Sequence, residues 1–201
     1  GSDLPSGRKV LPGTYKIVLT YGEHSGTTSI EVQSDPREQV SLEDLQKKTF
    51  TYDELQFKAK VITEAFNRLK EVKKTVDKVN VQFENLEDTV KKDLKKKGEE
   101  ITKKANKLMD LFIKPKDFVG YDHVTIRLMD HVWTSMDYIK SGQGAPSKTT
   151  LDYIELTEKK MQKVLSMVNK FIAEDWAAYR EKVEKSKTSL FKEYEELEIE
   201  D

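Results

Sequence analysis

The chain has 201 residues, and its 35 basic and 36 acidic side chains leave a formal net charge of −1. That near-neutral balance argues against a dedicated nucleic-acid binder, since such domains carry a clear positive excess. The absence of Cys removes disulfides, thiolate catalysis and every metal site that needs a Cys ligand.

The first forty residues predict a β-hairpin. Apolar and polar side chains alternate over residues 15–21 and again over 28–32, with a turn at 22–26 and an Asp35-Pro36 terminator. One hairpin is too little sheet to be stable alone. Its apolar side chains therefore either pack on the helices or belong to a sandwich whose other strands lie outside this chain, and we favour the second interpretation. An edge exposed in this way can pair with another copy.

From Ser41 onward the pattern is helical. Capping boxes at Ser41 and Thr51 predict a short helix near 42–48 and a long helix from about residue 52. The long helix has apolar residues at steps of three and four as far as Leu94. Lys95-Lys96-Lys97-Gly98 is its predicted turn, because Lys suits a helix C-terminus and Gly suits the cap.

Three further helices are predicted before an acidic C-terminal tail, which we expect to fray. The first ends at Lys114-Pro115, the second spans roughly 122–140, and the third begins at Ser147 or Thr149 and continues through Val183. The predicted fold is thus mainly α: an antiparallel up-and-down bundle of about four helices in residues 41–201, preceded by a small β-hairpin in residues 1–40.

No residue pattern predicts catalysis. His123 and His131 are eight positions apart, too far around a helix to share one metal ion. The chain has no nucleophile elbow, Walker loop or dinucleotide fingerprint. We therefore predict that the protein is not an enzyme and that it holds no cofactor or metal. Trp133, Trp176 and Tyr179 fall on apolar stripes, which places them in the predicted core.

A Lys-rich segment and a loop are the candidate interaction surface. The segment, residues 91–107, includes Lys95, Lys96, Lys97 and Lys103. It is either the solvated tip of a helical turn or a docking surface for acidic groups. Phe118 and Tyr121 lie in the loop beside Gly120 and are candidates for an exposed contact.

Residues 11–20 (LPGTYKIVLT) and 30–37 (IEVQSDPR) resemble the C-terminal region of large bacterial β-propeller proteins described as sortilin-like or BNR-repeat glycosyl-hydrolase-like. In that family a Pro-Gly-Thr-Tyr strand and its partner finish an Ig-like β-sandwich, and Asp-Pro-Arg leads into a helical tail. Further similar segments are Phe66-Asn67-Arg68-Leu69, Arg127-Leu128-Met129 and Gly144-Ala145-Pro146-Ser147.

The resemblance implies that residues 1–40 are the last hairpin of an Ig-like sandwich and that propeller domains precede it. It also implies a bacterial exported protein, whose targeting signal lies outside this chain. Gly1 and Ser2, typical of a cleaved expression tag, agree with a native start upstream. None of the family's catalytic residues maps onto these positions.

We therefore expect a non-catalytic C-terminal module that docks on the parent's β-propellers or on another protein, without nucleic acid or a membrane span. One alternative is an accessory fragment of a glycan-degrading or glycan-binding protein, for which Trp133 and Trp176 would share an exposed groove. Another is a coiled-coil adaptor that forms homodimers through residues 55–94. A weak homodimer through the strand edge or the first helix also stays open.

Overall fold

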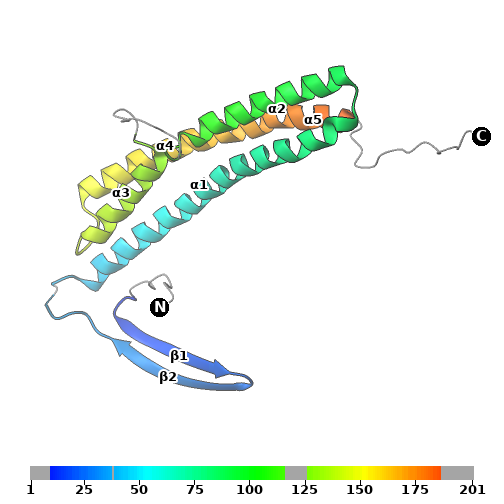
Figure 1. Cartoon of the computed structure of the whole chain (residues 1–201). Coiled ribbons are helices and arrows are strands. Elements are labelled where there is room, and N and C mark those ends of the chain that lie inside the picture. The colour runs from blue at the N-terminus through cyan, green and yellow to red at the C-terminus, as the bar shows by residue number, and fades with distance from the viewer. Residues whose placement is uncertain (1–9, 38, 116–125, 187–201) are drawn as a thin grey trace, which may run out of the picture.

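A computed structural model describes residues 10–115 and 126–186, apart from residue 38. Within these ranges the protein is mainly helical: four helices, the last of them α4 and α5 joined end to end, follow a two-stranded antiparallel hairpin (Figure 1). The predicted fold class is confirmed. The acidic tail, Phe118 and Tyr121 lie outside the described residues.

The hairpin consists of β1 (Gly13–Tyr21) and β2 (His24–Val32), paired from Gly13 opposite Val32 to Tyr21 opposite His24. Its turn is shorter than the predicted 22–26, because Ser25 and Gly26 already pair with β1. Gly22 has a left-handed φ of 58°, a conformation that costs glycine little.

The first helix, α1 (Leu42–Gln82), is continuous, so the predicted break near residue 50 is wrong. Ser41 caps it as predicted, since its side chain accepts a hydrogen bond from the Asp44 N–H. Thr51 does not start a second helix. Its hydroxyl donates to the Lys47 carbonyl inside the helix at 2.9 Å, an alternative open to any helical Thr.

The turn after α1 lies twelve residues earlier than predicted, at the 3₁₀ segment Phe83–Asn85 rather than at 95–98. Phe83 is fully buried there and anchors the bend. Helix α2 (Asp88–Met109) then carries the whole Lys run, and Gly98 is buried in its interior. A Cβ at Gly98 would lie 2.9 Å from Val76 Cγ1, so this glycine permits close packing of α2 on α1 rather than a cap.

The remaining helices are α3 (Leu128–Ser141), α4 (Lys148–Phe171) and α5 (Ala177–Lys185). A π-helical segment, Ile172–Trp176, joins α4 to α5 without a break, so the two form one rod. Ser147 caps α4, as predicted, by accepting from the Thr150 N–H. Helix α3 begins at Leu128, later than the predicted 122, because the residue before it, Arg127, is extended.

Helix α3 continues α2 in the same direction instead of reversing it (Figure 1). The Leu128 and Met129 N–H groups donate to the Leu111 and Phe112 carbonyls, both at 3.0 Å. The first free N–H groups of α3 are thereby satisfied by the turn that follows α2. The core runs between three parallel axes: α1, the α2–α3 line, and the α4–α5 rod, with Leu55, Ile62, Leu69, Val76, Leu94, Ala105, Val132, Ile139, Val168 and Tyr179 among its residues.

Candidate interaction site

The hairpin has one apolar face, and that face is exposed. Its register places Tyr15 opposite Ile30 and Ile17 opposite Thr28, so alternate residues of both strands share a side. Leu19 is 75% exposed and Tyr21 85% exposed. We call this surface the hairpin face; it comprises Tyr15, Ile17, Leu19, Tyr21, Ile30 and Val32.

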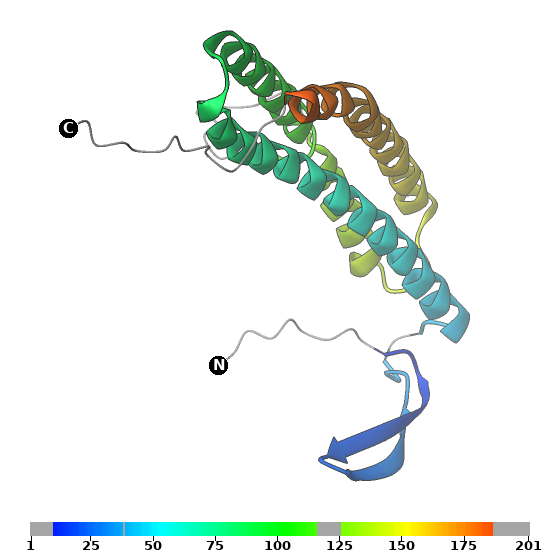
Figure 2. The same ribbon diagram turned by 90° about the vertical axis from the view of Figure 1, so that its right-hand side faces the viewer.

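The helices leave the hairpin face uncovered. Among the described elements, β1 and β2 have their one extensive contact with each other. Figures 1 and 2 show the hairpin lying clear of α1 and of the rods behind it. Both outer strand edges are also unpaired within the described residues, because the sheet has two strands. The hairpin is therefore open at its edges and on its apolar side.

The linker between the hairpin and α1 is held at two points. Arg37 donates from Nη2 to Asp35 Oδ2 at 2.7 Å and from Nε to Asp35 Oδ1 at 3.0 Å. The side-chain and backbone hydrogen bonds from Arg37 hold the pKa of Asp35 below its usual value. Val40 packs near Gly144, where a Cβ would lie 3.6 Å from Val40 Cγ1. These contacts tie the linker to itself and to the α3–α4 loop.

A second apolar surface lies on α1, on the side opposite the core. Phe50 is 64% exposed, Phe57 70% and Val61 38%. Their spacing of seven and four residues puts them in one line along the helix, while Leu55, Ala59 and Ile62 face inward. We call these three residues the α1 stripe. The sequence pattern did not single it out, because Phe57 and Val61 fit no single predicted seam.

Helix α2 carries the predicted Lys surface, in which Lys96 and Lys103, seven residues apart, share one face. Lys95, Lys96 and Lys97 follow one another in α2 and so point about 100° apart. Lys95 pairs with Glu84, Nζ to Oε1 3.0 Å. Lys103 lies away from it, beside Lys107 on the rim of the groove described next.

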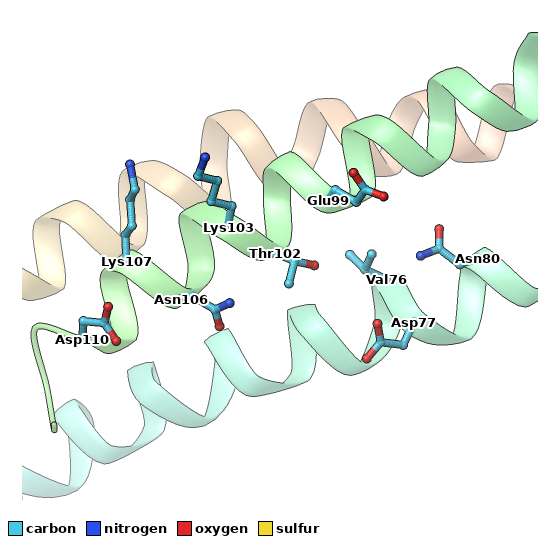
Figure 3. A pocket seen from close by; sticks show the side chains of 9 residues that line it. All are labelled: Val76, Asp77, Asn80, Glu99, Thr102, Lys103, Asn106, Lys107 and Asp110. Carbon is cyan, nitrogen blue, oxygen red and sulfur yellow. The ribbon is translucent and has the colours of Figure 1, made fainter. Parts of the chain in front are cut away.

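A shallow polar groove lies between α1 and α2 (Figure 3). It has a volume of about 400 Å³ and is lined by Val76, Asp77, Asn80, Glu99, Thr102, Lys103, Asn106, Lys107 and Asp110. Beside it, Asn80 Oδ1 and the Tyr179 hydroxyl are buried without a hydrogen-bond partner, and burial raises the pKa of Tyr179. The lining combines acidic, basic and amide side chains and has no His, Cys or Ser.

The three aromatic residues predicted for the core differ in their burial. Tyr179 is buried, and Trp176 is partly buried with its ring centroid 5.8 Å from that of Tyr179. Trp133 is 53% exposed, so its predicted burial is wrong. The buried face of α3 is formed by its neighbours His131, Val132 and Ser135, which leaves Trp133 on the outer side. The two Trp residues lie on different rods, and neither lines the α1–α2 groove.

Polar contacts in the interior hold α3 against α4. His131 is buried, and its Nδ1 shares a 2.9 Å hydrogen bond with the Tyr153 hydroxyl. Burial lowers the pKa of His131, the Lys160 charge lowers it further, and Asp130 opposes both. Ser135 and Thr157 share a second bond of 2.9 Å. These groups satisfy one another, so they are structural rather than a site.

The described part of the chain shows neither a metal-binding cluster nor a membrane-spanning helix. No group of three or more His, Asp or Glu side chains there could hold a metal ion. No helix in those ranges is long and apolar enough to cross a membrane. No family model matches the chain, and neither does a curated protein or a solved structure.

Proposed function

We propose that this protein is a non-catalytic interaction module, in which the helical rods are the support and the hairpin is the docking element. One observation carries the proposal: a hairpin with exposed Leu19, Tyr21 and Ile30 that no described helix covers. A two-stranded hairpin is marginally stable by itself in water. Its apolar face and open edges are therefore completed by a partner.

A β-rich partner suits the hairpin best. Unpaired strand edges present rows of N–H and C=O groups that another strand can bond. Burial of the hairpin face adds about 25 cal/mol per Å² of apolar surface removed from water. A sheet that adds to the edge and covers the face would supply both contributions.

The resemblance suggests which β-rich partner this is. In the sortilin-like proteins such a hairpin finishes an Ig-like sandwich, so we propose docking on the Ig-like or β-propeller part of the parent, or on a protein of that kind. The same resemblance places the module in a bacterial exported protein. The helices would then act as a projecting support rather than as a second binding domain.

A binding titration tests this proposal. The probe is the recombinant propeller and Ig-like region of a sortilin-like bacterial protein, titrated calorimetrically against the chain. We expect saturable binding that Ile30→Glu weakens by at least about tenfold, because a charge on the hairpin face cannot be buried unpaired. Val81→Glu is the matched control, since Val81 is 73% exposed on α1, far along the chain from the hairpin. No binding, or equal weakening by both variants, contradicts the proposal.

The alternatives gain no support. A glycan platform would need Trp133 and Trp176 exposed in one groove. Trp133 is exposed, but Trp176 is partly buried and packs against Tyr179. A coiled-coil homodimer would need the apolar seam of residues 55–94 to be exposed for a second copy. Leu55, Ile62, Leu69 and Val76 of that seam are instead buried in the core of the chain itself.

A further inference from the structure

Two uncovered apolar surfaces of the described chain lie on the hairpin and on the N-terminal part of α1, towards the same end of the molecule (Figure 1). One is the hairpin face, with Leu19 and Tyr21 the most exposed. The other is the α1 stripe, with Phe50 and Phe57 exposed by 64% and 70%. An exposed surface that combines large aliphatic and aromatic side chains marks an interaction site.

The two surfaces fit each other in size. Tyr15 and Tyr21 are six residues apart in β1, so about 20 Å of strand separates them. Phe50 and Val61 are eleven residues apart in α1, so about 16 Å along the helix axis separates them. A two-stranded sheet is also about as wide as one helix, near 10 Å with side chains. One hairpin can therefore lie lengthwise along one stripe.

The linker directs the hairpin away from its own stripe. The Asp35–Arg37 pair orders the chain just after the hairpin, and Val40 packs near Gly144 just before α1. With these contacts in place the hairpin stands clear of α1 (Figures 1 and 2). A second molecule can present its α1 to the hairpin without disturbing either contact.

We propose that the hairpin face of one copy packs on the α1 stripe of a second copy, and that the reverse contact forms at the same time. Tyr21, Phe50 and Phe57 are 85%, 64% and 70% exposed, so at roughly 150–250 Å² for each whole side chain they supply about 440 Å² for one contact. The exposed parts of Leu19, Ile17, Ile30 and Val61 add to this area. A stable interface buries about 1,200–2,000 Å² in total. Two symmetric contacts reach the lower limit and one does not, which is why the exchange is reciprocal.

This inference rests on the proposed function, because the hairpin is the docking element in both. It assigns the hairpin face to a second copy of the chain whenever the β-rich partner is absent. Phe57 belongs to the copy–copy contact alone, since it lies on α1 and outside the hairpin. Variants at Phe57 therefore separate the two proposals.

Sedimentation velocity from micromolar to millimolar protein is the test. We expect wild-type chain to pass from monomer to dimer as its concentration rises. Phe57→Glu and Leu19→Glu should each raise the dissociation constant by at least about tenfold, since each places a charge in a buried contact. Circular dichroism checks that both variants keep the helical content of the wild type.

Mixing the two variants is the decisive measurement. An equimolar mixture of Phe57→Glu and Leu19→Glu chains contains one intact pair of surfaces: the hairpin of the first variant and the stripe of the second. The mixture should therefore associate more tightly than either variant alone. Pairing of like surfaces, hairpin on hairpin or stripe on stripe, predicts no such recovery, and absence of recovery overturns the proposal.

Two matched controls share the same chemistry. Val18→Glu places a charge on the other side of the hairpin, where Val18 is 56% exposed, and Val81→Glu places one elsewhere on α1. Both should dimerise as the wild type does. A wild-type chain that stays monomeric at every concentration overturns the inference, as does dissociation by either control. If Phe57→Glu leaves dimerisation unchanged while Ile30→Glu still blocks the β-rich partner, this inference fails and the proposed function stands.

Discussion

At the residue scale, two buried positions set the tightest constraints on the fold. Gly98 of α2 faces Val76 of α1 and Tyr179 of α5. His131 is an ionisable group held in the α3–α4 contact. The consequence of changing either follows from its immediate surroundings.

Gly98→Ala should destabilise the protein. The new Cβ would lie 2.9 Å from Val76 Cγ1, and Val76 is itself buried and unable to move far. Overpacking of this kind costs about 1–3 kcal/mol, which outweighs the roughly 1 kcal/mol that alanine gains in a helix interior. Urea unfolding followed by circular dichroism measures the net loss.

Gly142→Ala is the control for that substitution. Its Cβ would meet nothing closer than 3.8 Å, and Gly142 has an ordinary φ of −69°. We expect a change within about 0.5 kcal/mol. An equal loss for both variants would mean that close packing at Gly98 does not limit stability.

The stability of the protein should fall as pH decreases from about 6.5. The pKa of His131 is lower in the folded chain than its ordinary value, chiefly because of burial. The unfolded chain therefore binds more protons just below pH 6.5, so protonation favours unfolding, and the loss continues until the pH reaches the folded pKa. Denaturant unfolding between pH 5 and 7 measures the slope.

Replacement of the His131 imidazole tests whether this group is the source of the pH dependence. His131→Gln should flatten this pH dependence, although it also loses the bond to Tyr153 and lowers stability overall. His24→Gln, in an exposed turn-flanking position, should leave the slope as it is. A slope that survives in His131→Gln would assign it to other groups.

At the scale of single elements, α3 is unusual because its start is hydrogen-bonded to the turn that follows another helix. The first N–H groups of a helix have no partner within it. In α3, the Leu128 and Met129 N–H groups instead donate to the Leu111 and Phe112 carbonyls, in the turn that follows α2. The α2–α3 line therefore behaves as one interrupted rod.

Amide hydrogen exchange should detect this junction. We expect the Leu128 and Met129 amides to exchange slowly, with protection close to that of the α3 interior. The Lys148 and Thr149 amides, which open α4 with no such partner among the described residues, should exchange fast. Equal, fast exchange at both helix starts would show that the junction opens readily.

The sequence pattern predicts some of these elements well and others poorly, for identifiable reasons. The hairpin and the Ser41 and Ser147 caps follow from strictly local rules, and the structure agrees with them. Gly98 and Thr51 each suit a turn or cap and also the inside of a helix. Packing against Val76 and Tyr179 accounts for the place of Gly98, whereas Thr51 bonds to the Lys47 carbonyl of its own helix. The α1 stripe and the exposure of Trp133 depend on where neighbouring helices lie, which one chain's periodicity does not specify.

At the scale of the whole molecule, the hairpin and the helical rods are separate units of stability. The core lies between the three helical axes, and no hairpin residue is among its buried members in the described chain. Ion pairs between rods, such as Lys58–Glu158 at 2.7 Å and Lys104–Asp175 at 2.6 Å, also lie within the helical part.

Deletion of the chain before Ser34 should therefore leave the helices intact. We expect the free energy of unfolding to change by less than about 0.5 kcal/mol, because the deletion removes no core contact. Thermal and urea unfolding, followed at a helical wavelength, provide the comparison with the full chain. A loss of several kcal/mol would show that the hairpin buttresses the rods.

The open hairpin also bears on how the protein behaves in concentrated solution. Strand β1 reads GTYKIVLTY, so Lys16 is its one charged side chain, and the strand lies on an unpaired edge. A stretch rich in β-branched and aromatic residues on an open edge can stack with copies of itself into fibrils. Lys16 is then a gatekeeper whose charge keeps neighbouring edges apart. Neutralising it would favour fibrils over any closed, soluble pair, even though it touches neither the core nor the α1 stripe.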